Sequence, residues 1–146
     1  MTNTGEPVEI LLAEDNPGDA KLTEKAFEQG NILNNLYIVE NGVEAMKFLR
    51  QEGEFEDNPR PDLVLLDLNM PRKDGWEVLE EIDEDPDLRG FPVIVLTSSE
   101  AESDIVRSYE LQANAYLTKP VDYSGFMDII QRFEDFWLSV VKMPPK

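Results

Sequence analysis

Short apolar runs, separated by helix-length segments of mixed polarity, are the feature that most restricts how this chain folds. There are five such runs: VEILLA (8–13), LYIV (36–39), LVLL (63–66), VIVL (93–96) and AYL (115–117). Runs rich in Val, Ile and Leu without polar alternation are typical of strands buried on both faces of a parallel sheet. Alternating strands and helices imply right-handed crossovers with helices on both faces. The sequence therefore predicts an α/β three-layer sandwich with a five-stranded parallel sheet.

The segments between these runs carry signals for helix starts. Asn16 is followed by proline, which suits an N-cap and the first position of a helix. Asn-Gly at 41–42 and Asp-Gly at 74–75 precede a second and a third helix, a fourth is expected over 98–111, and Asp122 is expected to cap the last. Apolar residues at helical spacing give the helices a face for the core. For four of the helices these residues are Ala20, Leu22, Ala26 and Phe27; Val43, Met46, Phe48 and Leu49; Trp76, Val78, Leu79 and Ile82; and Phe126, Ile129, Ile130, Phe133 and Trp137.

Composition narrows the chemistry that the chain can carry out. The 146 residues have a formal net charge of −18 and include neither cysteine nor histidine. The charge opposes binding to nucleic acid and to anionic membranes, which both need clustered Lys and Arg. The missing residue types exclude disulfides, thiolate nucleophiles, His or Cys metal ligands and Ser-His-Asp triads. Carboxylates, hydroxyls and lysine are left, and they suit oxygen-preferring cations such as Mg²⁺ or Ca²⁺.

Length and segment composition predict one domain over 8–142, with a polar extension over 1–7 and a tail over 143–146. No apolar run approaches the roughly 20 residues of a membrane span and no targeting signal precedes the first run, so a soluble cytoplasmic protein is expected. The acidity leaves two explanations open, a solvated surface in an ordinary cell or adaptation to a salty cytoplasm. Seven lysines, abundant Asp and Glu and no cysteine modestly favour the halophilic explanation, because salt screens self-repulsion.

Polar residues interrupt the apolar runs at their downstream ends. Glu14 and Asp15 follow the first run and Asp67 follows the third. Thr97 follows the fourth run and Lys119 lies just beyond the fifth. In a doubly wound parallel sheet these ends point to one edge, where ligands bind at the point at which the strand order reverses. Three carboxylates brought together repel one another, and a hard divalent cation such as Mg²⁺ would relieve that repulsion. Lys119 adds a mobile positive charge for a phosphoryl group.

With these residues the chain resembles a receiver domain of the two-component response-regulator family. The matching blocks, within about 9–137, are LLAEDN (11–16), PDLVLLDLNMPRKDGWEVL (61–79), PVIVLTSS (92–99) and AYLTKP (115–120). Within the family, the chain is most similar to single-domain regulators paired with phytochrome-like or other sensory histidine kinases. The resemblance implies a flavodoxin-like receiver fold with sheet order 2-1-3-4-5 and five helices.

The resemblance also implies roles for the acidic residues. Asp67 resembles the phosphoacceptor, whose carboxylate attacks a phosphohistidine on a partner kinase. Asp15, Asp67 and the backbone carbonyl of Asn69 resemble the Mg²⁺ ligands. Glu14 matches the other acidic position, which acts through metal-bound water.

Three further positions match a switch that follows phosphorylation. Lys119 resembles the lysine that pairs with the acceptor carboxylate and then with the phosphoryl oxygens. Thr97 resembles the hydroxyl that moves to bond the phosphoryl group, and Tyr116 the aromatic residue whose rotation follows it. The family carries a cis peptide at the position of Lys119-Pro120, and X-Pro bonds are where cis is least unfavourable.

The implied partners are a sensory histidine kinase as phosphodonor and a downstream protein target, with no DNA and no membrane. Output would pass through helix 100–111, strand 115–117 and helix 122–137. The segment at the end of the last predicted helix contains more apolar residues than one core-facing stripe requires. These residues either pack into the core or form a homodimer interface. The residues concerned are Phe136, Trp137, Leu138, Val140 and Val141.

Two other functions fit parts of the pattern. A Mg²⁺-dependent phosphohydrolase with an aspartyl nucleophile would need a second Asp two residues after it and a substrate cap, but the chain has Asn69 there and no cap-sized insertion. A binding module of the same fold that needs no phosphorylation would not have to keep the acidic residues, Thr97 and Lys119. A phosphoacceptor signalling protein rather than an enzyme is therefore the leading hypothesis.

Overall fold

A five-stranded parallel sheet forms the centre of the molecule. The computed structural model describes residues 7–29, 33–97, 115–119, 121–122, 124–125 and 128. The strand order is β2-β1-β3-β4-β5, and all four neighbouring pairs are parallel. The predicted strands and their order are confirmed, with four strands extending slightly beyond the apolar runs. The strands are β1 (Val8–Ala13), β2 (Asn34–Val39), β3 (Leu63–Asp67), β4 (Val93–Thr97) and β5 (Ala115–Thr118).

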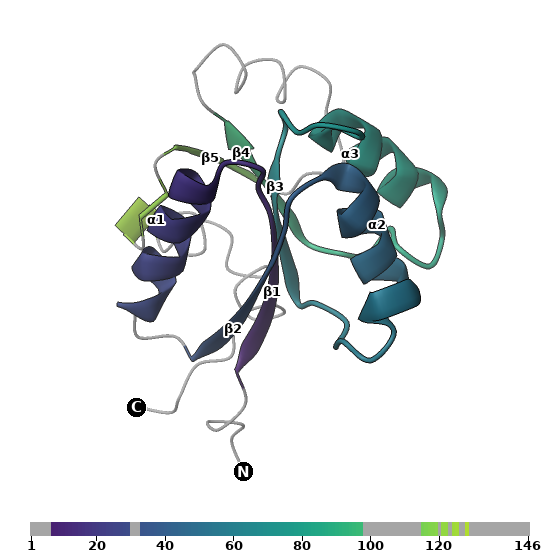
Figure 1. Ribbon diagram of the computed structural model, residues 1–146, viewed down its shortest axis with the longest axis horizontal. Coiled ribbons are helices and arrows are strands. Elements are labelled where there is room, and N and C mark those ends of the chain that lie inside the picture. Colours follow the sequence, from purple (N-terminus) through teal and green to yellow (C-terminus); the bar gives the residue numbers. More distant parts are fainter. Residues whose placement is uncertain are drawn as a thin grey trace.

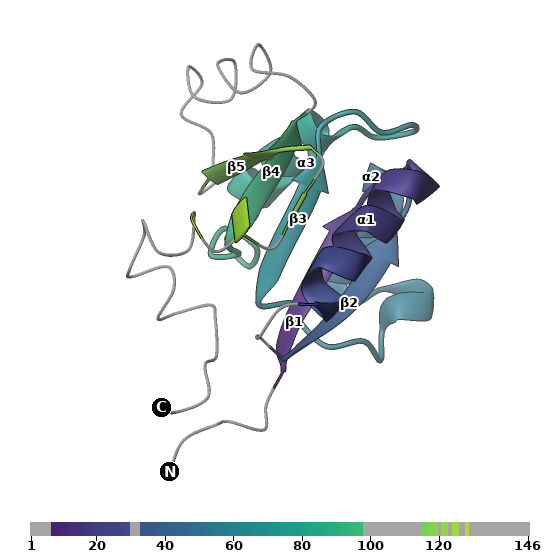
Figure 2. The same cartoon turned by 90° about the vertical axis from the view of Figure 1, so that its left-hand side faces the viewer.

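Helices cover both faces of this sheet, as the alternation of strands and helices predicted. α1 (Pro17–Glu28) lies on one face, and α2 (Gly42–Arg50) and α3 (Gly75–Glu84) lie together on the other (Figure 1). Figure 2 shows α1 in front of β1 and β2, with its axis running along the strands. The predicted helix 98–111 lies outside the described residues, as do the predicted boundary segments 1–6 and 143–146.

The last predicted helix lies mostly outside the described residues as well. Its described part consists of Ser124, Gly125 and Asp128, which are helical. The Asp122 carboxylate accepts a hydrogen bond from the backbone N–H of Gly125, as the predicted N-cap requires. The apolar residues of this helix, the C-terminal apolar segment proposed as a dimer contact, and Pro120 are not among the described residues.

Side-chain caps fix where α1, α2 and α3 begin, whereas the short 3-10 helix Gly53–Phe55 has no side-chain cap. Asn16 accepts from the N–H of Asp19 at 3.0 Å, and proline occupies the first turn of α1. Asn41 accepts from the N–H of Glu44 at 2.9 Å at the start of α2. At the start of α3, Asp74 forms a reciprocal capping box with the residue three positions on. Each cap directly follows a strand end or a strand-end loop, so these helices begin close to the carboxyl edge of the sheet.

The core has two layers, one on each face of the sheet. Alternate strand residues point to opposite faces, so a strand covered on both sides needs apolar residues at every position. This explains the unbroken apolar runs. The layer under α2 and α3 includes Leu11, Val64, Leu66, Val93 and Val95 with Phe48, Leu49, Leu79 and Ile82; the layer under α1 includes Ile10, Leu12, Leu63, Leu65 and Ile94 with Phe27.

The predicted core face of α1 is wrong at one position. Leu22 is 49% exposed, whereas Thr23 is buried between Ala20 and Phe27 in the helical repeat. The spacing of 20, 23 and 27 places these residues on one stripe, and Leu22 lies beside it. The Thr23 hydroxyl donates to the Asp19 carbonyl at 3.1 Å, so burial leaves no unsatisfied polar group on this side chain.

Candidate functional site

Three carboxylates meet where β1 and β3 end side by side. Glu14 and Asp15 directly follow β1, and Asp67 is the last residue of β3. One carboxylate oxygen from each of the three lies within 4.8 Å of the others. Glu14 is 1% and Asp67 4% exposed, while Asp15 is exposed to solvent. The predicted convergence is confirmed, and the cluster has a buried side and an open side.

Lys119 reaches this cluster from the end of β5. Its Nζ lies 2.9 Å from Oε1 and 3.1 Å from Oε2 of Glu14, and 3.2 Å from Oδ2 of Asp67. The Lys119 side chain is 15% exposed, so the ammonium is largely removed from water. The predicted meeting of Lys119 with the strand-end acids is confirmed.

A further acidic residue, Asp19, completes the surroundings of the ammonium. Its Oδ2 lies 3.2 Å from Lys119 Nζ. Sequence reasoning missed Asp19 because an acid in the first turn of a helix is ordinarily explained by the helix dipole. Its position four residues after Asp15, in the first turn of the helix that starts at the sheet edge, is the signal that could have found it.

Burial and charge set the proton affinities of the cluster. Burial raises the pKa of Glu14 to about 7; the hydrogen bond from Lys119 opposes that shift, and contact with the charged Asp67 adds to it. Burial alone would lower the pKa of Lys119. Its hydrogen bond to Glu14 and the charges of Asp67 and Glu14 outweigh burial and raise that pKa above its ordinary value. The ammonium is thus held in its charged form, whereas Glu14 titrates near neutrality.

The carboxylate oxygens of the cluster are donor atoms that suit a hard divalent cation. It gathers carboxylate oxygens from three residues and has more carboxylates than ammonium groups. Mg²⁺ typically takes one or two carboxylates and keeps several waters, which the exposed position of Asp15 permits. The chemistry of these side chains therefore suits Mg²⁺ or a similar ion.

Close backbone packing holds the segment that follows Asp67. The N–H of Asn69 donates to Oδ1 of Asp67 at 3.2 Å. A Cβ at Gly75 would lie 2.4 Å from the carbonyl oxygen of Asp67, so only glycine fits there. The N–H of Gly42 donates to the Lys73 carbonyl at 2.9 Å, and a Cβ at Gly42 would lie 2.2 Å from that oxygen. The first residues of α2 and α3 thus pack closely against the two ends of the loop 68–74. This packing restricts the position of the loop and the orientation of Asp67.

An ion-pair network supports the same loop from outside. Lys73 pairs with Glu81 of α3, and Arg50 of α2 lies 3.2 Å from the same carboxylate. Arg50 also lies 3.4 Å from Asp85. Exposed pairs of this kind contribute little each, roughly 0–1 kcal/mol, but a network restrains geometry. Sequence reasoning missed these contacts because they depend on the packing of α2 against α3.

The two predicted switch residues lie on neighbouring strands. Thr97 ends β4 and pairs in register with Thr118, which places its backbone at the carboxyl edge of the sheet; its side chain lies outside the described residues. Tyr116 is half-buried and packs against the core layer under α2 and α3. The structure thus places the backbones of both residues on β4 and β5, the last two strands in the sheet order.

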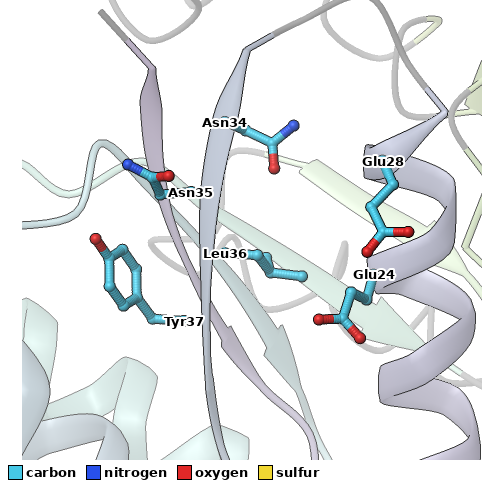
Figure 3. Close-up of a pocket in the computed structure, with 6 residues that line it drawn as sticks. All are labelled: Glu24, Glu28, Asn34, Asn35, Leu36 and Tyr37. Carbon is cyan, nitrogen blue, oxygen red and sulfur yellow. The ribbon is translucent and has the colours of Figure 1, made fainter.

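A separate hollow of about 300 Å³ lies between α1 and β2. In Figure 3, Leu36 extends from β2 toward α1, whereas Tyr37 extends to the other face of the strand. The first residues of β2 line the hollow, so it lies toward the amino ends of the strands and away from Asp67. It is distinct from the acidic cluster. Its lining residues are Glu24, Glu28, Asn34, Asn35, Leu36 and Tyr37.

The fold and the strand-end acids define a receiver domain, and comparison with known proteins agrees. Residues 10–131 match the response regulator receiver domain, and the chain belongs to that family. It is 47% identical over 138 residues to the response regulator Rcp1 of a Synechocystis species, with 94% of each chain covered. Family membership is thereby confirmed. Within the part of the chain that the structure describes, no helix is long and apolar enough to cross a membrane.

Two solved structures show the same similarity. The bacteriophytochrome response regulator RtBRR superposes with a TM-score of 0.83 at 40% identity, covering 96% of this chain and 85% of that one. The Mn²⁺-bound form of Rcp1 superposes with a TM-score of 0.73 at 47% identity, covering 95% of this chain and all of that one. The flavodoxin-like receiver fold and the similarity to phytochrome-associated regulators, both predicted from the sequence, are therefore confirmed.

Proposed function

We propose that Asp67 accepts a phosphoryl group from a phosphohistidine of a partner sensory histidine kinase. The observation that carries this proposal is the contact between Lys119 Nζ and Oδ2 of Asp67 at 3.2 Å, at a buried strand end beside Glu14 and Asp15. Receiver domains of response regulators act with histidine kinases, and this chain belongs to their family. Because this chain contains no histidine, the phosphohistidine has to lie outside it.

The reaction needs a nucleophile, a leaving group and charge neutralisation. A carboxylate oxygen of Asp67 attacks the phosphorus, and a new P–O bond forms. The P–N bond of the phosphohistidine breaks, and the imidazole leaves with the electron pair and takes up a proton. The ammonium of Lys119 pairs with the carboxylate beforehand and with the phosphoryl oxygens afterwards. Positioning and electrostatic stabilisation of this kind supply most of the catalysis in phosphoryl transfer.

Mg²⁺ is the proposed cofactor. Asp15, Asp67 and the backbone carbonyl of Asn69 would hold it, with Glu14 acting through metal-bound water. When bound, the ion supplies positive charge that neutralises the transferring oxygens. The clustered carboxylate oxygens support this proposal, and so does the Mn²⁺-bound form of the relative Rcp1.

Phosphorylation would act on a switch formed by Thr97 and Tyr116. The phosphoryl group adds negative charge and new acceptors, to which the Thr97 hydroxyl would bond. The space that Thr97 leaves would admit the ring of Tyr116, which is half-buried at the edge strand β5. This is a local charge change that biases a two-state packing element. The changed surface over helix 100–111, strand 115–117 and helix 122–137 would then bind a downstream protein target.

The net charge of −18 opposes DNA and anionic membranes as partners, so output goes to a protein. The proposal includes a homodimer through the C-terminal helix region and a cytoplasmic location. It also divides the chain into an N-terminal extension over 1–7, a receiver domain over 8–142 and a tail over 143–146. The protein turns over its own phosphoryl group and acts on no other substrate.

Mass spectrometry after treatment with acetyl phosphate and Mg²⁺ tests this function. The unsubstituted protein should gain one phosphoryl group, and Asp67→Asn should gain none. Asp57→Asn is the matched control, because Asp57 is an exposed loop residue and loses the same charge. Labelling that persists in Asp67→Asn would place the acceptor elsewhere.

A further inference from the structure

The ammonium of Lys119 lies among three carboxylates, two of which accept hydrogen bonds from it. An ammonium carries three N–H groups. Glu14 and Asp19 accept hydrogen bonds from it at 3.1 and 3.2 Å, and Oδ2 of Asp67 lies 3.2 Å away. These two hydrogen bonds hold the ammonium in place, so an ammonium that moves to follow the phosphoryl oxygens formed at Asp67 has to break one of them.

The three partners differ in how easily they release Lys119. The Glu14 side chain is fully buried, and a buried carboxylate that loses its counter-ion is strongly destabilised. Asp67 is the group on which the phosphoryl group forms. The Asp19 side chain is 35% exposed, so water can replace the ammonium at its carboxylate. Asp19 is therefore the carboxylate that releases the Lys119 ammonium most easily.

From this arrangement we propose that Asp19 is a positioning residue that holds the Lys119 ammonium in the resting state and thereby slows phosphorylation of Asp67. The inference rests on the proposed function of Asp67. Asp19 is not one of the three carboxylates that gather at the strand ends, and it acts through Lys119. Its negative charge also opposes the arrival of the anionic donor next to the ammonium.

The backbone of Asp19 keeps the residue in place independently of its carboxylate. Its N–H donates to Asn16 at 3.0 Å, and its carbonyl accepts from the Thr23 hydroxyl at 3.1 Å. Both bonds use backbone groups and survive substitution of the side chain. Asp19→Ala therefore removes the contact with Lys119 while leaving the cap of α1 intact.

The test is the rate of Asp67 phosphorylation by acetyl phosphate at saturating Mg²⁺, followed by mass spectrometry. In this reaction an Asp67 oxygen attacks the phosphorus, the P–O bond to the acetyl group breaks, and acetate leaves with the electron pair. Asp19→Ala should react about three- to tenfold faster, the factor that one hydrogen bond contributes. Asp19→Glu should restore the slower rate, and Glu28→Ala, an exposed carboxylate of the same helix, should leave it unchanged.

A double-mutant cycle separates positioning from general electrostatics. In the Lys119→Ala background, adding Asp19→Ala should change the rate by less than about twofold, because the group that Asp19 holds is gone. The same acceleration in both backgrounds overturns the inference, as does an unchanged rate in Asp19→Ala alone. If the unsubstituted protein takes no phosphoryl group, the proposed function itself fails, and the inference fails with it.

Discussion

The ammonium of Lys119 lies 2.9 Å from the buried carboxylate of Glu14, across 105 residues of sequence. The pair joins the ends of β1 and β5, which lie on opposite sides of β3 in the sheet. Lys119 therefore spans the strand that ends in Asp67. The stability of the sheet edge and the chemistry that we propose at Asp67 therefore depend on the same side chain.

Lys119→Met should destabilise the metal-free protein by about 3 kcal/mol above neutral pH, because it leaves a buried carboxylate without a counter-ion. The loss should shrink below pH 7, where Glu14 takes up a proton. Urea unfolding on both sides of that pH measures it. Lys21→Met, at an exposed position of α1, is the control and should change little. A loss that is the same on both sides of pH 7 would contradict the role of Glu14.

The raised pKa of Glu14 predicts how stability depends on pH. The folded protein keeps a proton on Glu14 up to about pH 7, whereas the unfolded chain releases it near 4.5. The contribution of Glu14 to stability is therefore complete below pH 4.5 and declines as pH rises to about 7. The slope reaches about 1.4 kcal/mol per pH unit. Glu14→Gln should flatten this part of the unfolding curve in Mg²⁺-free buffer, and an unchanged slope would refute the assignment.

Asp15→Asn should weaken Mg²⁺ binding about tenfold, equal to ~1.4 kcal/mol, because the exposed carboxylate is a proposed direct ligand. The rise in melting temperature on adding Mg²⁺ reports the affinity. Asp87→Asn removes an exposed carboxylate outside the cluster and should bind Mg²⁺ as the unsubstituted protein does. Equal affinities in both variants would remove Asp15 from the ligand set.

Gly42→Ala should destabilise the protein by about 3 kcal/mol, because its Cβ would lie 2.2 Å from the carbonyl oxygen of Lys73. The loop that follows Asp67 would have to shift, so phosphorylation should slow as well. Gly90→Ala is the matched control, since a Cβ there meets nothing within 4 Å. Thermal unfolding and the acetyl phosphate reaction measure both effects. Equal stability of the two variants would show that the loop accommodates a side chain.

The strand-end acids could be predicted from sequence because a parallel sheet fixes their geometry. Once five buried runs are assigned, Asp67 and Lys119 have to arrive at one edge whatever the loops do. The N-caps at Asn16 and Asp74 were predictable for a similar reason, since capping depends on residues within one turn.

Two other features escaped a search for apolar stripes and strand-end acids. Thr23, not Leu22, lies on the buried stripe of α1, and a carbonyl of the same helix accepts a hydrogen bond from its hydroxyl. Asp19 becomes a partner of Lys119 only in the folded protein, where the lysine side chain reaches the start of α1 from 100 residues further along the sequence. In both cases a polar side chain has a role that a sequence pattern does not predict. Hydrophobic periodicity predicts an apolar residue in the core face of α1, and helix-start statistics explain Asp19 by the helix dipole.

The contrast between buried Glu14 and solvent-facing Asp15 has a kinetic consequence. A cation bound on the open side of the cluster would exchange with the surrounding medium without any separation of the sheet. Under the proposed function, each round of phosphorylation could then reload its metal ion without any opening of the fold.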